Sequence, residues 1–128
     1  MSLPWTTNVD MLTGTSPAEN SIGVTTPTVG AAIDVSKRQQ ITVQFIGTIT
    51  SGNGNFSLDV SNDGKNWVQG VAFLDALATG VGTYVVSKGI SSITPFGAAV
   101  ITPGFRYIRC RLDVSGTGTY YAILEAAG

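Results

Sequence analysis

The chain has 128 residues, of which 43% are apolar and only 12% are charged, and its formal net charge is −1. This length fits one domain with one core, and a share of charged residues about half the usual one predicts a weakly charged surface. No apolar run approaches the roughly 20 residues that cross a bilayer. The one basic cluster in the sequence, Arg106, Arg109 and Arg111, is only a weak indication of nucleic-acid binding. We therefore expect neither a membrane nor a nucleic acid as partner.

The first 30 residues contain prolines and glycines throughout and show neither a helical nor a strand period. They are predicted to form an extended N-terminal arm, 1–30, and the rest of the chain, 31–128, a β-sandwich domain. Either the domain itself or a neighbouring copy is expected to hold the arm. If a neighbour holds it, deleting residues 1–16 should abolish attachment and leave the domain folded. The apolar residues that would anchor the arm on the neighbour are Leu3, Trp5, Val9, Met11 and Leu12.

Alternation of apolar and polar residues predicts a strand over 39–50 and another over 56–61. Between them, "SGNGN" (51–55) supplies residues that tolerate positive φ, so the two strands are predicted to form a hairpin. In the second strand, the apolar side chains face one side of the sheet and the polar ones face the other. The apolar set is Phe56, Leu58 and Val60, and the polar set is Ser57, Asp59 and Ser61.

A second turn follows at Asn62, Asp63 and Gly64. The side chains of Asn62 and Asp63 are predicted to cap this turn, and Gly64 to adopt positive φ. Residues 66–73 return as a strand, with Trp67 packed just beyond the turn. The same turn and Asp59 bring three oxygen-bearing side chains together, but calcium prefers about six to eight ligands, so a structural turn is favoured over a calcium site.

Further strands are predicted over 82–88, 105–114 and 120–126, the last two joined by the glycine-rich segment 115–119. Prolines within 89–104 argue against a central strand there. In the strand 105–114, Ile108, Cys110, Leu112 and Val114 fall on one face, and Tyr107, Arg109, Arg111 and Asp113 on the other.

These elements predict an all-β fold, an antiparallel β-sandwich or small jelly roll of about 7–8 strands with an extended N-terminal arm. The single Cys110 is expected to be a small core hydrophobe. With no internal disulfide and no leader sequence visible, assembly in a reducing cytoplasm is expected.

Catalytic signals are weak, because the chain contains no histidine. That excludes Ser-His-Asp and Cys-His arrangements and weakens the usual zinc sites. The acidic residues are scattered, and turns or solvent faces explain most of them. We expect no enzyme, no cofactor and no metal site. Arg109 and Arg111, two apart on one strand face, could pair with acidic groups on a neighbouring strand or subunit, and a solvated or cross-strand charge row is the favoured interpretation.

Two stretches, "FSLDVSNDGKNWV" (56–68) and "PGFRYIRCRLDVSGTGTYYAILEA" (103–126), together resemble small β-sandwich virion proteins of tailed phages. The likeness covers roughly residues 39–126. It implies a non-enzymatic capsid decoration (cement) protein or another accessory protein of the virion, folded in the bacterial cytoplasm. Such a protein would be a homo-oligomer, often a trimer, and would bind the major capsid protein or another virion protein. The arm residues, with Arg109 and Arg111, would form the interface.

Two alternatives stay open from the sequence. One is a carbohydrate-binding or adhesion module, in which exposed aromatic side chains stack on a sugar. It predicts that Trp67→Ala abolishes glycan binding without unfolding the protein, and a Trp67 buried in the core would count against it. The other is a self-assembling filament subunit, in which the arm completes the sheet of the next copy.

Overall fold

The computed structural model describes residues 6–36, 40–74, 82–90 and 105–127, and nearly all of them lie in or between antiparallel strands. The predicted all-β, antiparallel class is confirmed, while the choice between sandwich and jelly roll stays a prediction. Among the described residues, no helix has the length and hydropathy needed to cross a membrane. In chain order the elements are β1 (Thr6–Asp10), the 3-10 helix η1 (Ala18–Asn20), β2 (Thr28–Val29), β3 (Ile33–Asp34), β4 (Gln40–Ser61), β5 (Val68–Leu74), β6 (Gly82–Ile90) and β7 (Tyr107–Ala127).

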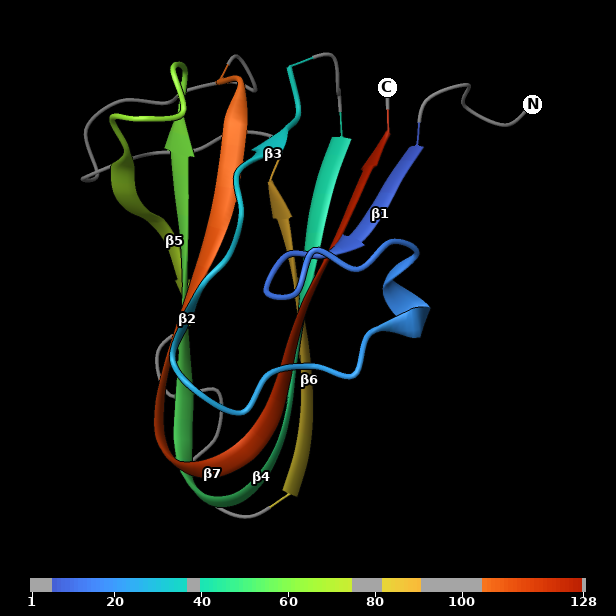
Figure 1. Ribbon diagram of the computed structural model, residues 1–128, viewed down its shortest axis with the longest axis vertical. Coiled ribbons are helices and arrows are strands. Elements are labelled where there is room, and N and C mark those ends of the chain that lie inside the picture. The colour runs from blue at the N-terminus through green and yellow to red at the C-terminus, as the bar shows by residue number, and fades with distance from the viewer. Residues whose placement is uncertain (1–5, 37–39, 75–81, 91–104, 128) are drawn as a thin grey trace.

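Two long strands, β4 and β7, form the spine of the fold. They pair with each other from Gln40 opposite Ala127 to Ser61 opposite Tyr107. Figure 1 shows both strands curving together at the bottom of the molecule, so that one sheet folds over on itself. We call the two sides of this fold the β1 half, where β1 flanks β7 and β6 flanks β4, and the β5 half, where β2 and β3 flank β7 and β5 flanks β4.

A β-bulge at Thr50 lets both halves direct their apolar side chains to the same core. The register changes there, because Ile49 lies opposite Gly118 and Ser51 lies opposite Thr117. One extra residue moves the inward positions of β4 from odd to even numbers, whereas β7 keeps even numbers inward throughout. The inward residues of β4 are Ile41, Val43, Phe45 and Ile49 before the bulge, and Phe56, Leu58 and Val60 after it.

The two predicted loops 51–55 and 115–119 are therefore bends inside strands, and the hairpin predicted between 39–50 and 56–61 is wrong. Both segments are instead parts of one strand, β4, and each pairs with β7. Gly52 (φ +72°) and Gly116 (φ +92°) supply the positive φ that the sequence indicated. Here that freedom bends a strand pair instead of reversing the chain.

We expect Gly116→Ala to destabilise the protein by about 2 kcal/mol or more, since a left-handed backbone is costly for residues with a Cβ atom. The added Cβ would also overlap the carbonyl oxygen of Ser51. Gly14→Ala is a matched control, because Gly14 also has positive φ (+79°) but a Cβ there meets nothing within 4 Å. Urea denaturation should show the larger loss for Gly116→Ala. Equal losses would mean that crowding at the bend contributes nothing.

The core lies between the two halves of the folded sheet. Phe45 in the β1 half and Phe56 in the β5 half have ring centroids 4.6 Å apart, and Tyr120 meets Phe56 edge-on at 6.1 Å. Aromatic pairs in such offset or edge arrangements add to the stabilisation from buried area. Cys110 is fully buried in this core, which confirms its prediction as a small core residue.

The described part of the predicted arm, residues 6–30, belongs to this same sheet. Strand β1 pairs with the end of β7, with Val9 opposite Leu124, and Val24 bridges to Tyr120. The buried carboxylate of Asp10 fastens the segment that follows β1: it accepts hydrogen bonds from the backbone N–H groups of Leu12 (3.0 Å) and Ala122 (3.2 Å) and from the Ser21 hydroxyl (2.5 Å). No break in the sheet separates the predicted arm from the predicted domain.

Three of the predicted anchor residues point into the chain's own core, so their assignment to a neighbouring copy is corrected. Val9, Met11 and Leu12 are 7%, 0% and 6% exposed and pack with the other core residues. Pairing of β1 with β7 directs Val9 inward, because it shares the inward face of Leu124, and the Met11 N–H donates to the Ala122 carbonyl just beyond β1. Leu3 and Trp5, the other two predicted anchors, lie outside the described residues. Residues 91–104 also lie outside them, and these make up most of the segment 89–104 in which no central strand was predicted.

Replacing Tyr120 with phenylalanine should leave stability unchanged or raise it by up to about 1 kcal/mol. The Tyr120 side chain is fully buried, and its hydroxyl has no hydrogen-bond partner in the described part of the structure. Removing an unsatisfied buried polar group removes its desolvation cost. Thermal denaturation of Tyr120→Phe, compared with Tyr121→Phe at a half-buried position, measures the effect. A clear loss at Tyr120 alone would show that its hydroxyl is bonded.

Candidate functional site

The outer face of the β5 half carries a row of buried polar groups. Ser57, Asp59 and Ser61 alternate with the core residues of β4 and therefore point away from the core, yet they are only 9%, 0% and 4% exposed. Strand β7 places Arg111 opposite Ser57 and Arg109 opposite Asp59. Because directly opposed residues share a face of the sheet, both guanidinium groups reach the buried carboxylate.

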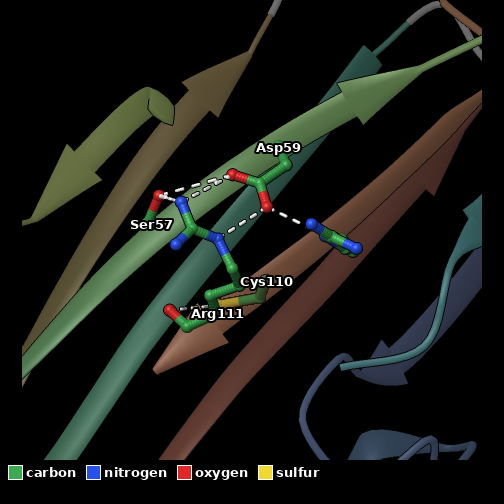
Figure 2. A network of polar contacts seen from close by, with 5 residues as sticks. Ser57, Asp59, Cys110 and Arg111 are labelled. Carbon is green, nitrogen blue, oxygen red and sulfur yellow. Dashed lines mark hydrogen bonds and ion pairs between the residues drawn. The ribbon is translucent and has the colours of Figure 1, made fainter. Parts of the chain in front are cut away.

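Asp59 accepts hydrogen bonds from both arginines, as Figure 2 shows for Arg111. Arg111 binds it in a bidentate manner, from Nε to Oδ2 at 2.7 Å and from Nη2 to Oδ1 at 3.1 Å. Arg109 donates from Nε to Oδ2 at 2.9 Å, and Arg111 Nη2 also donates to the Ser57 hydroxyl at 3.0 Å. Charge-assisted bonds with this geometry are the strong ones. The predicted cross-strand charge row is thus observed, and it tightens the β4–β7 pairing.

Trp67 completes the arrangement from the turn before β5. The Arg109 Cζ atom lies 4.3 Å from the centroid of the Trp67 ring, within the range of a cation–π contact. Trp67 itself is half-buried. We call the set of Ser57, Asp59, Trp67, Arg109 and Arg111 the Asp59 cluster. The carbohydrate-binding alternative stays a prediction. It depends on the Trp67 ring, and Arg109 lies over one face of that ring.

The turn that presents Trp67 forms as predicted. Gly64 has a φ of +74°, and Asp63 Oδ1 accepts the backbone N–H groups of Lys65 and Asn66, both at 2.8 Å. These bonds hold the pKa of the Asp63 carboxyl well below its usual range, and the bond from the Asn66 N–H has the largest effect. Asn62 differs from its predicted role, because its Oδ1 reaches across to the backbone N–H of Arg106 at 3.1 Å.

The oxygens that were weighed as calcium ligands do not converge on one point. Those of Asp59 face arginines, those of Asp63 accept N–H groups of its own turn, and that of Asn62 binds the chain before β7. Within the described ranges, no group of three or more acidic, Cys or His side chains gathers in a way that could hold a metal ion.

The chemistry available to the cluster is electrostatic. The hydrogen bond with Asp59 raises the pKa of the Arg111 guanidinium, so Arg111 stays charged. Burial, and then the charge of Asp59, raises the pKa of the Cys110 thiol, which keeps that thiol protonated and poorly reactive. Two positive groups share one carboxylate, so the cluster as a whole carries positive charge.

Sequence reasoning placed Asp59 on a solvent face and so missed its burial. Alternation shows to which side of a sheet a side chain points, but it does not show what covers that side. The signal that was available is the pairing of one acid on 56–61 with two arginines on 105–114, two strands whose core faces were both predicted correctly. An acid facing two arginines predicts an ion pair wherever the strands are neighbours.

Two hollows mark the surface of the described residues. One, of about 530 Å³, lies on the outer face of the β1 half between β1, η1 and β7, and it is lined by Asn8, Pro17, Ala18, Glu19, Gln44, Ile123 and Glu125. The other, of about 360 Å³, lies beside the turn after β4, and it is lined by Val60, Ser61, Asn62, Asp63, Asn66 and Val68.

No family model and no curated protein matches this chain. Among solved structures, it is similar to a chain in the structure of infectious bursal disease virus, Gx strain, with a TM-score of 0.43 and 14% identity. The likeness covers 97% of this chain and 29% of that one, so this chain spans less than a third of its viral neighbour. Its function is therefore inferred from its own residues.

Proposed function

We propose that this chain is a non-enzymatic structural protein of a phage virion, a capsid decoration or other accessory protein that acts through protein–protein contacts. The observation that carries the proposal is the Asp59 cluster. Its residues come from the two stretches that resemble phage virion proteins, 56–68 and 103–126, and the fold pairs these stretches side by side. The cluster therefore joins residues 56–61 of the first stretch to residues 107–112 of the second on one face of the sheet.

That face has the composition of a protein-binding surface. Trp and Arg are the residues most enriched among interface hot spots, and here Arg109 and Arg111 are already fixed by Asp59, so little side-chain entropy remains to be lost on binding. Val29, which is 62% exposed, lies opposite Arg111 on the neighbouring strand β2 and adds apolar surface beside the charges. When many copies bind one shell, many weak contacts together give a high overall affinity.

Three of the described groups that could do chemistry instead hold the structure. The Asp59 carboxylate is bonded to two arginines, the Asp10 carboxylate fastens the segment after β1, and the Cys110 thiol is buried. These roles support a structural protein, with copies of itself and another virion protein as its partners.

Mass spectrometry of purified virions from the phage that encodes this sequence tests the proposal. We expect the chain to be present at a copy number comparable with that of shell subunits. Particles made without its gene should lose their genome at a lower temperature than the wild type. A chain absent from purified particles would overturn the proposed function.

A further inference from the structure

The hollow of about 530 Å³ on the β1 half is lined by side chains from β1, η1, β4 and β7. Strand pairing sets its floor, because Asn8 lies opposite Glu125 and Gln44 lies opposite Ile123. Opposed residues share a face of the sheet, and the core side chains of these strands fill the other face. The helix η1, which lies beside β1 (Figure 1), adds Glu19. The volume is within the range of ligand pockets, about 300–1,000 Å³.

Hydrogen bonds within the protein hold one polar pair of this lining in place. The Asn8 carboxamide donates from Nδ2 to Glu125 Oε2 at 3.0 Å, and its Oδ1 accepts the backbone N–H of Ala18 at 2.7 Å. The backbone carbonyl of Asn8 also accepts the Ser16 hydroxyl at 2.8 Å. The Glu125 carboxylate is therefore positioned before any ligand arrives, and a group that is already fixed loses little entropy on binding.

Gln44 brings a polar group that the protein itself does not use. Its side chain is half-buried, and its carboxamide makes no hydrogen bond with any other described residue. A carboxamide offers two N–H donors and one acceptor oxygen. Ile123, which is half-buried and lies opposite Gln44, and Pro17 add apolar surface beside it. The hollow thus combines donors, acceptors and apolar contact.

This combination selects the class of ligand. An added peptide strand needs free backbone groups, but β7 is paired here with both β1 and β4. The carboxylates of Glu19 and Glu125 have the wrong charge for a phosphate group, and they supply too few oxygens for calcium, which takes about six to eight. A neutral ligand with several hydroxyl groups fits the lining, since carboxylates accept from hydroxyls and a carboxamide both donates and accepts.

We propose that this hollow binds a saccharide, with Gln44 and Glu125 bonded to its hydroxyl groups and Ile123 in contact with its C–H surface. The inference goes beyond the proposed structural function and does not depend on it. It also differs from the carbohydrate-binding alternative drawn from the sequence, which depends on Trp67 in the β5 half. Because the ligand is neutral, its binding should not weaken as salt is added.

A glycan microarray probed with the fluorescently labelled full-length chain tests the proposal, with bacterial-surface and mucin-type glycans as the printed probes. We expect the wild type to bind a subset of these glycans, in low and in high salt. Gln44→Ala and Glu125→Ala should each weaken that binding about fivefold or more, the usual effect of losing one hydrogen bond.

Two further variants are the matched controls. Gln69→Ala removes an exposed glutamine from β5, outside the hollow, and should bind like the wild type, as should Trp67→Ala. Thermal denaturation should show that Gln44→Ala and Glu125→Ala remain folded, because neither side chain belongs to the core.

Two results would overturn the saccharide site. One is a wild type that binds none of the printed glycans, and the other is glycan binding that Gln44→Ala and Glu125→Ala leave unchanged. Binding lost only in Trp67→Ala would place the sugar on the β5 half instead. The presence or absence of the chain in purified virions decides the proposed function separately.

Discussion

Asp59→Ala is expected to lower the free energy of unfolding by about 3–5 kcal/mol, the usual cost of removing one partner from a buried ion pair. The Asp59 side chain is fully buried, and both arginines lose their acceptor at once. Since small domains are stable by only about 5–15 kcal/mol, the variant should be close to its unfolding threshold at 37 °C. Urea denaturation followed by tryptophan fluorescence measures this loss directly, because Trp67 lies against Arg109.

Two further variants define the origin of that loss. Asp113→Ala removes an exposed carboxylate from the same face of β7 and should change stability by no more than about 0.5 kcal/mol. The triple variant Asp59→Leu, Arg109→Met, Arg111→Leu removes the charges together, and stability should recover most of what Asp59→Ala loses. If the triple variant is as unstable as Asp59→Ala, the orphaned guanidinium groups are not the cause.

The parts of this fold that could be predicted are those that depend on residues close together in the sequence. The turn at 62–64 follows from Asp63 and Gly64, which act on N–H groups and φ angles within a few residues. The face of β7 was also predicted, because the alternation over 105–114 has no interruption and strands have a period of two. Both features depend only on residues within one short segment, and the structure confirms both.

Distant pairing decided the features that sequence reasoning got wrong. The segment 51–55 has the composition of a hairpin turn, and a bulged bend uses one of its glycines, Gly52, for the same positive φ. Only the pairing of both parts of β4 with β7 distinguishes the two, and that pairing joins residues 46 to 87 positions apart. The arm was misassigned for the same reason, because β1 finds its partner at the far end of the chain, beyond residue 120.

This placement of β1 reverses the expected result of a truncation. Deleting residues 1–16 should now unfold the protein instead of releasing an intact domain from its partner. The deletion removes a strand paired with β7 together with Val9, Met11 and Leu12, each buried in the core. Burying one such side chain contributes about 1.5–3 kcal/mol, so the summed loss is comparable with the whole stability of a small domain.

Thiol labelling of Cys110 gives a sensitive measurement of that unfolding. Cys110 is fully buried, and burial raises its pKa, so the native protein should react slowly with a thiol reagent such as Ellman's. The deletion of 1–16 should react at the rate of the urea-unfolded chain. A truncation that begins at residue 6 keeps β1 and all three core residues and is the matched control. Slow labelling of the 1–16 deletion, with an unchanged far-UV spectrum, would show that β1 is dispensable and would return residues 6–16 to the role of an arm.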